Sequence, residues 1–263
     1  MRVGISSAVF YPQISEVAIE KICNAEVACA EFFYNCDYEI SDVYVDTLKK
    51  YITDKKTEII SVHPYTAFAE DVFFFSDYER RTEENIKRYS EIFNRAKRLG
   101  AKFLTLHGER LNKSTFSGVE IAEKRAMNSL SALADEAKRC GITLCLENVA
   151  WCKSSDLEYL RRVSENVDNI CFTLDLKQAR RAAIPYERYL EIMWERLRNI
   201  HVSDCRGAND CLLPGEGEFD FSRFIDQVKQ LGYAGDFIIE VYSSAFEEEN
   251  KIFKAKDYLE SLL

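Results

Sequence analysis

Short runs of consecutive hydrophobic residues alternate with longer amphipathic stretches along the whole chain. Residues 103–106 (FLTL) and 237–239 (FII) are two of these runs, and nearly every position in them is apolar. Runs without polar alternation are typical of strands that are covered on both faces of a parallel sheet. We predict eight strands, over residues 3–7, 29–33, 58–63, 102–107, 143–147, 170–175, 199–203 and 236–241.

The stretches between these runs carry the signals of helix ends. In the S-x-x-E capping box the Ser and Glu side chains bind backbone N–H groups of the first helical turn. This pattern predicts helix starts at Ser76, Ser117 and Ser155. Glycines at positions 100, 141 and 232 come directly before predicted strands, where a glycine commonly ends the preceding helix.

Eight strands that alternate with helices over 263 residues predict an α/β fold of the (β/α)8 TIM barrel type. No linker or change of composition divides the chain, so a single domain over residues 1–263 is expected. An open, doubly wound sheet is the alternative. It is disfavoured because the first predicted strand is not followed by a G-x-G-x-x-G turn.

Composition and charge disfavour several classes of partner and site. The formal net charge is −9 and no dense basic run occurs, which disfavours a nucleic acid as partner. None of the 9 cysteines forms a CxxC pair, so reduced thiols are expected rather than a structural zinc site. No apolar run approaches the ~18 residues that a membrane helix needs, and the start lacks a signal-peptide pattern. We expect a cytoplasmic protein without a membrane partner.

The histidines show where the chemistry lies. His63, His107 and His201 are the three histidines of the chain, and each falls at the predicted end of a strand. In a TIM barrel the catalytic groups lie at the C-terminal ends of the strands. A single histidine at such a position is usually structural, but three on one rim favour a functional site.

Three carboxylates complete this set, since Glu147, Asp175 and Glu240 also end apolar strands. Together with His201 they would project from four consecutive strands toward one point. Three carboxylates repel one another unless a cation is present, and mixed oxygen and nitrogen ligands suit Mn²⁺, Zn²⁺, Co²⁺ or Mg²⁺. We therefore predict one divalent metal ion on these four residues. The alternative is that the carboxylates cap helices or pair with Arg and Lys at the barrel mouth.

Short motifs in a fixed order support a family resemblance. They are LEN at 146–148, LD at 174–175, IHVSD at 200–204, LPGEGEFDF at 213–221 and GYAG at 232–235, followed by Glu240. In this order they resemble the xylose isomerase-like TIM barrels, a family described broadly as sugar phosphate isomerases and epimerases. The segments around His63 and His107 match the third and fourth strands of that family, so the resemblance covers essentially the whole chain.

The resemblance implies an activity. It implies a metal-dependent isomerase or epimerase of a small sugar or keto-polyol, with Glu147 and Glu240 as acid/base groups on opposite faces of the substrate. A metal bound to the carbonyl and the adjacent hydroxyl acidifies the neighbouring C–H group and stabilises the enediolate that forms. One carboxylate would remove the proton and the other would return it to the opposite face or to the adjoining carbon.

Four further residues are expected to bind the substrate. Gln178 stands where the family commonly has a histidine, and its amide can bind a substrate hydroxyl but is a poor metal ligand. Arg206 lies near the position where the epimerases place an arginine on substrate oxygens, and a solvated surface arginine is the alternative. His63 and His107 are expected to face the substrate, because their strands lie across the barrel mouth from that of His201.

Other functions remain open at this stage. A lyase that dehydrates a keto-inositol would use the same metal and the same proton abstraction. A hydrolase similar to the apurinic endonucleases would need more histidines and a basic surface. A binding protein without turnover is a third alternative. The aromatic residues at 65, 68 and 73–75, and Trp151, would either cover a sugar or form packing contacts, including contacts between copies in a homo-oligomer.

Overall fold

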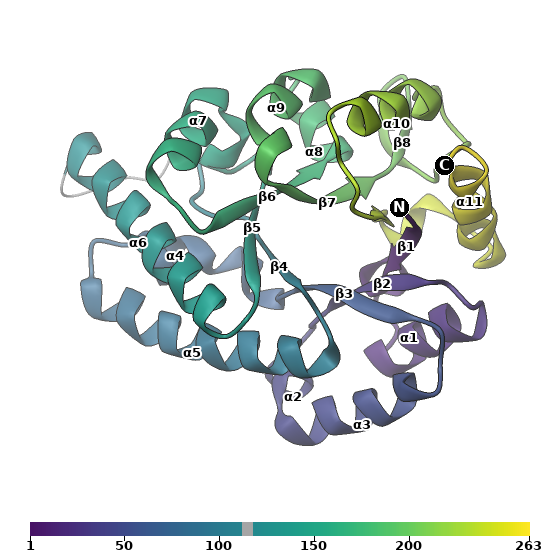
Figure 1. The fold of residues 1–263 in the computed structure, drawn as a ribbon, viewed down its shortest axis with the longest axis horizontal. Coiled ribbons are helices and arrows are strands. Elements are labelled where there is room, and N and C mark those ends of the chain that lie inside the picture. Colours follow the sequence, from purple (N-terminus) through teal and green to yellow (C-terminus); the bar gives the residue numbers. More distant parts are fainter. Residues whose placement is uncertain (112–117) are drawn as a thin grey trace.

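Eight parallel strands form a closed barrel in the computed structural model, which describes residues 1–111 and 118–263. The strands follow one another around the barrel in chain order, and the last closes on the first (Figure 1). They are β1 (Val3–Ser6), β2 (Cys29–Phe33), β3 (Glu58–His63), β4 (Phe103–Leu106), β5 (Thr143–Glu147), β6 (Ile170–Asp175), β7 (Leu197–Val202) and β10 (Phe237–Ile239). The predicted (β/α)8 barrel is confirmed, with strand bounds that differ by at most two residues at either end.

Helices surround the barrel (Figure 1). They are α1 (Ser15–Asn24), α2 (Asp37–Ile40), α3 (Asp42–Thr53), α4 (Glu70–Phe74), α5 (Glu79–Leu99), α6 (Val119–Arg139), α7 (Leu157–Asn166), α8 (Leu176–Arg181), α9 (Tyr186–Met193), α10 (Phe221–Gln230) and α11 (Asn250–Glu260). Their apolar faces and the outer faces of the strands share one continuous hydrophobic core. Among the described residues, no helix has the length and apolar character needed to cross a membrane.

The helix ends agree with the sequence at the glycines but not at the predicted capping boxes. Glycines 100, 141 and 232 all have positive φ, as the prediction requires. Helix α7 is capped by Asp156, whose carboxylate accepts the N–H of Tyr159, and not by Ser155. The Ser155 hydroxyl donates instead to the Cys152 carbonyl. Ser76 does not cap α5, which begins at residue 79, and Ser117 lies outside the described residues.

A short antiparallel hairpin follows β7 and was not expected from the sequence. It consists of β8 (Asp204–Arg206) and β9 (Asn209–Leu212). The buried carboxylate of Asp204 accepts the backbone N–H groups of Cys205, Gly215, Gly217 and Phe219 at 2.7–3.0 Å. A Cβ atom at Gly217 would lie 2.2 Å from Asp204 Oδ1. The aspartate therefore shapes the 213–221 loop, and its close approach explains why residue 217 of the motif is a glycine.

We expect replacement of Asp204 by alanine to lower the free energy of unfolding by ~3 kcal/mol, because four backbone N–H groups lose a buried, charged acceptor. The urea midpoint would measure this loss. Asp220→Ala is the matched control, since it removes only the N-cap of α10 and should cost about 1 kcal/mol. Equal losses in the two variants would show that Asp204 is an ordinary cap.

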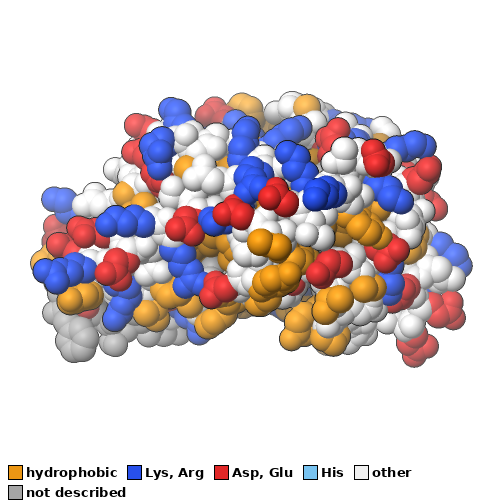
Figure 2. Space-filling view, turned by 90° about the horizontal axis from the view of Figure 1, so that it is seen from below, with side chains coloured by type: hydrophobic (Ala, Val, Ile, Leu, Met, Phe, Trp, Pro, Cys, Tyr) orange, Lys and Arg blue, Asp and Glu red, His pale blue; other side chains and the backbone are white. Residues whose placement is uncertain are grey.

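Charges of both signs are interspersed on the face shown in Figure 2, and hydrophobic side chains gather along its lower edge.

Candidate functional site

The four predicted metal ligands lie together at the carboxyl ends of their strands. Glu147 and Asp175 are the last residues of β5 and β6, His201 pairs in register with Asp175 on β7, and Glu240 follows β10. One ligand atom from each residue lies within 4.8 Å of the others. The barrel therefore brings together four side chains that are up to 93 positions apart in the sequence, since 240 − 147 = 93.

The donor atoms of this group point at one another around His201 Nδ1. This atom lies 3.5 Å from Glu147 Oε1, 3.9 Å from Asp175 Oδ2 and 3.4 Å from Glu240 Oε2. His201 Nδ1 and Asp175 Oδ2 are buried and have no hydrogen-bond partner among the described residues. Buried polar atoms normally have partners. Three carboxylate oxygens and an imidazole nitrogen, two of them without a hydrogen-bond partner, are a donor set that fits a divalent metal ion.

Local structure aims Asp175 at this point. Asp175 is the N-cap of α8, and its Oδ1 accepts the N–H of Gln178 at 2.8 Å, which leaves Oδ2 free to face the site. The Asn148 side chain accepts the Asp175 N–H at 2.7 Å and donates to the Asp175 carbonyl at 3.1 Å. This pair of bonds fixes the ends of β5 and β6 beside each other, which gives the LEN motif a structural role.

Glu31 orients His201 from the opposite side of the ring. Its Oε2 lies 3.1 Å from His201 Nε2, and it also accepts hydrogen bonds from Ser61 and Asn199. A carboxylate on the far nitrogen of a metal-binding histidine fixes the tautomer and orientation of the ring. Sequence reasoning missed this residue. Its signal was a single charged side chain within the apolar strand 29–33.

We expect Glu31→Gln to weaken metal binding about 10- to 100-fold, because the histidine loses the charged group that holds its ring in place. Titration of the metal-free protein with Mn²⁺ would measure the change. Glu39→Gln is a suitable control, since Glu39 is also buried but accepts a hydrogen bond from Ser15. An unchanged affinity in a folded Glu31→Gln protein would remove Glu31 from the site.

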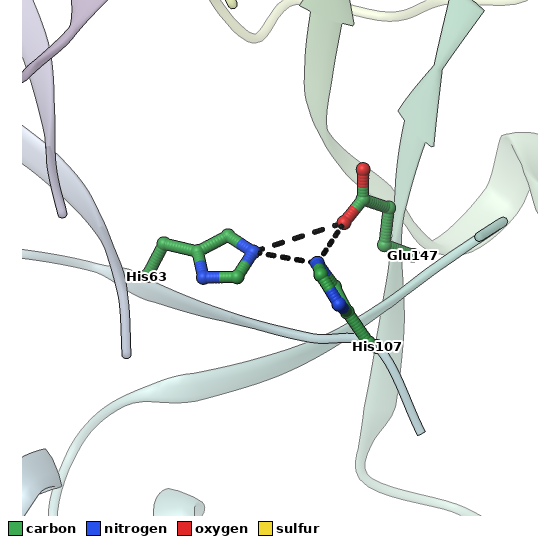
Figure 3. A group of neighbouring side chains, drawn as sticks. All are labelled: His63, His107 and Glu147. Atoms are coloured by element: carbon green, nitrogen blue, oxygen red, sulfur yellow. Dashed lines mark hydrogen bonds and ion pairs between the residues drawn. The ribbon is translucent and has the colours of Figure 1, made fainter. Parts of the chain in front are cut away.

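A second group shares Glu147 with the first. His63 at the end of β3 and His107 just after β4 point toward Glu147 (Figure 3). His107 Nε2 lies 3.1 Å from Glu147 Oε2, and the two histidine Nε2 atoms lie 2.9 Å apart. These three side chains could also hold a metal ion. Glu147 therefore faces His201 with one oxygen and His107 with the other.

The electrostatics of the group favour ionised glutamates. Burial opposes ionisation of Glu147, yet hydrogen bonds from the surrounding histidines hold its pKa well below the usual range. Burial also opposes ionisation of Glu240, whose pKa is held well below the usual range by Lys177 and His201. At Asp175, burial and the two neighbouring glutamates raise the pKa to about 7, although Lys177 acts to lower it.

The same glutamates raise the pKa values of His201 and His63. Burial acts to lower the pKa of His201, but Glu31, Glu240 and Glu147 raise it well above its ordinary value. Burial likewise opposes protonation of His63, and Glu147 is the main group that raises its pKa, to about 9. The carboxylates therefore favour positive charge at their centre, which a metal ion would supply with release of the proton on His201.

Lys177 is a further charged member of the site that sequence reasoning missed. Its side chain is buried, and Nζ lies 3.1 Å from Glu240 Oε2 and 3.4 Å from Asp175 Oδ2. The ring of Tyr242 lies 5.2 Å from the same atom. From the sequence, pairing of the carboxylates with a basic residue is the alternative to a metal site. Asp175 and Glu240 do pair with Lys177, beside the predicted metal position.

A pocket of about 370 Å³ opens above these residues. Five of the predicted site residues line it, and they are Glu147, Glu240, His63, His107 and, on α8, Gln178. The remaining lining residues are mostly aromatic or apolar, and they are Ala8, Tyr11, Phe33, Asn35, Trp151, Lys177, Val241 and Tyr242. A concave space with apolar walls and a few polar groups is typical of a small-molecule site.

Arg206 lies apart from this pocket. Its guanidinium donates to the carbonyl of Glu216, its side chain is exposed, and it is not among the lining residues. The prediction that Arg206 binds the substrate therefore has no support from the structure. The reason is the β8–β9 hairpin, which carries the residue away from the end of β7.

The aromatic residues divide between the two expected roles. Trp151 lines the pocket, and its ring lies 5.9 Å from that of His107. Phe74 is fully buried and packs on Tyr89 at 4.8 Å, and Tyr65 donates to Asp37, so these two make local contacts. None of the aromatic residues of the 65–75 segment lines the pocket.

The fold and the site agree with a known family. Residues 20–262 match the xylose isomerase-like TIM barrel family, and the chain belongs to it. An uncharacterised protein of Methanocaldococcus jannaschii is 24% identical over 91% of this chain and 83% of its own length. The L-ribulose-5-phosphate 3-epimerase UlaE of Salmonella typhi is 26% identical over 52% of this chain and 50% of its own length, so that match spans about half of each protein.

Solved structures show the same architecture. The crystal structure of a D-tagatose 3-epimerase-like protein superimposes with a TM-score of 0.81 at 22% identity, covering 100% of this chain and 97% of that chain. The structure of an IOLI protein with a zinc atom has a TM-score of 0.76 at 16% identity, covering 100% and 96%. These likenesses establish the barrel fold.

Proposed function

We propose that this protein is a metal-dependent isomerase or epimerase of a small sugar or keto-polyol. The observation that carries the proposal is that two glutamates, Glu147 and Glu240, line one pocket and belong to a group of four side chains whose ligand atoms lie within 4.8 Å of one another. The names of the epimerase relatives support the same class of substrate.

In this proposal Glu147, Asp175, His201 and Glu240 hold one divalent ion, which is Mn²⁺, Zn²⁺, Co²⁺ or Mg²⁺. Once bound, the ion would polarise the carbonyl and acidify the adjoining C–H group. The zinc atom in the IOLI structure supports a metal at this kind of barrel.

The protein's own residues would move the proton. One of the two glutamates takes it from the carbon next to the carbonyl, and the other returns it. His63, His107 and Gln178 would bind substrate hydroxyls from the pocket wall. Trp151 and Phe33 would cover the apolar face of the substrate and exclude water from the reacting carbon.

The test is conversion of a panel of ketoses and keto-polyols by the Mn²⁺-loaded protein, followed by NMR of the products. We expect at least one substrate to yield an epimer at the carbon next to the carbonyl or an isomer with a shifted carbonyl. A dehydrated product would establish the lyase instead. Cleavage of an abasic-site oligonucleotide without conversion of any ketose would establish the hydrolase.

Two single variants test the division between metal ligands and substrate groups. We expect His63→Ala and His107→Ala to lower turnover while metal content stays near one ion per chain, because the four-residue group is complete without them. Metal analysis of the purified variants would measure this. Loss of metal in either variant, or two ions in the native protein, would indicate a dinuclear site bridged by Glu147, which favours the hydrolase.

We further propose a cytoplasmic location, which fits nine cysteines that are all free in the structure. The substrate would be the main partner, and assembly into a homo-oligomer stays a hypothesis that a sedimentation measurement would test.

A further inference from the structure

Lys177 is the one lysine that lines the pocket in the described part of the chain, and it lies at the floor of the site. It is the second residue of α8, two positions after Asp175. Its side chain is only 4% exposed, so the ammonium cannot be satisfied by bulk water. The ammonium therefore depends on the carboxylates of the site for its partners.

The ammonium contacts the same oxygen atoms that a metal ion would need. Asp175 Oδ1 already accepts the Gln178 N–H, so Oδ2 is the oxygen free for a metal, and Lys177 Nζ lies 3.4 Å from it. Glu240 Oε2, which faces His201 Nδ1 at 3.4 Å, lies 3.1 Å from Nζ. Two of the four predicted ligands thus share their metal-facing oxygens with one fixed positive charge.

We propose that Lys177 is a tethered counter-ion of the metal centre that competes with the divalent ion for Asp175 and Glu240 and thereby sets its affinity. This inference rests on the proposed metal-dependent function. Two positive charges a few ångströms apart at a poorly solvated site repel each other strongly. When a metal binds, the ammonium gives up these two oxygens and moves toward the pocket.

Two other groups lie near the ammonium. The Glu240 carbonyl oxygen lies 3.5 Å from Nζ, and the Tyr242 ring lies 5.2 Å away. Arg181 donates to the Tyr242 hydroxyl at 2.8 Å, which holds this ring in place. The displaced ammonium would then face the substrate between Tyr242 and Gln178.

The experiment measures Mn²⁺ affinity in metal-free protein, by the loss of the free-ion EPR signal, for four variants and the native chain. We expect Lys177→Met to bind Mn²⁺ at least ~10-fold more tightly, because the competing charge is gone. Lys177→Arg should stay near the native affinity, and Lys177→Gln serves if the Met variant does not fold. Lys102→Met is the charge control, since Lys102 is exposed at the opposite end of β4.

Thermal unfolding gives an independent readout. Metal-free Lys177→Met should melt at a lower temperature than the metal-free native protein, because Asp175 and Glu240 lose their cation. Added Mn²⁺ should then raise the melting temperature of Lys177→Met by more than it raises that of the native protein. A role in packing alone would leave Mn²⁺ binding unchanged or weaker, and that result overturns the inference while the metal site stands. Failure of both native and Lys177 variants to bind Mn²⁺ overturns the proposed function and the inference together. Binding by Lys177→Met alone supports the inference.

Discussion

Replacing Glu147 or Glu240 by glutamine is expected to lower turnover at least ~100-fold, the lower end of what a positioned acid/base group contributes. Glutamine keeps an oxygen that can contact the metal but cannot accept the proton. Both glutamates line the pocket, and they lie 3.5 Å and 3.4 Å from His201 Nδ1. Steady-state kinetics on the substrate found in the ketose panel would measure the loss.

Two controls separate a lost base from a lost ligand. Metal content must be measured for each variant, because a weakened ligand would mimic a missing base. Glu187→Gln on α9, outside the pocket lining, should retain native turnover. One of the two site variants is expected to exchange deuterium into the substrate without forming product. A fully metal-loaded Glu240→Gln variant with native turnover would leave Glu240 as a ligand only.

Removal of the metal is expected to lower turnover about 1000-fold or more. A bound ion contributes several kcal/mol of charge stabilisation, and about 4 kcal/mol corresponds to that factor. Dialysis against a chelator followed by metal analysis would establish the loss, and added Mn²⁺ should restore activity. Asp175→Ala should not recover, because Asp175 supplies one of the four predicted ligand atoms. Undiminished turnover after the metal content has fallen to background would contradict the account.

The barrel and the four-residue group could be predicted because both follow from strand ends. Apolar strands buried on both faces are visible as continuous runs, and parallel strands place their carboxyl ends on one rim. A charged residue at the end of such a run must then face the same rim, which is how Glu147, Asp175 and Glu240 were found. The family motifs added the acid/base roles, which spacing alone does not supply.

The residues that sequence reasoning missed act across the barrel. Glu31 reaches His201 from a strand 170 positions away, and Lys177 reaches Glu240 across 63 positions. Such contacts depend on the order and tilt of strands, which a local pattern does not encode. Arg206 lies outside the pocket lining, on the β8–β9 hairpin, which the local sequence pattern did not predict.

The central claim is proton transfer at the carbon next to a carbonyl, and solvent exchange tests it most directly. The metal-loaded protein would be incubated in D₂O with the converted ketose, and the product and recovered substrate examined by NMR. The account predicts deuterium at the carbon next to the carbonyl, and none after metal removal or with both glutamates replaced. Product that forms without any solvent deuterium would contradict it.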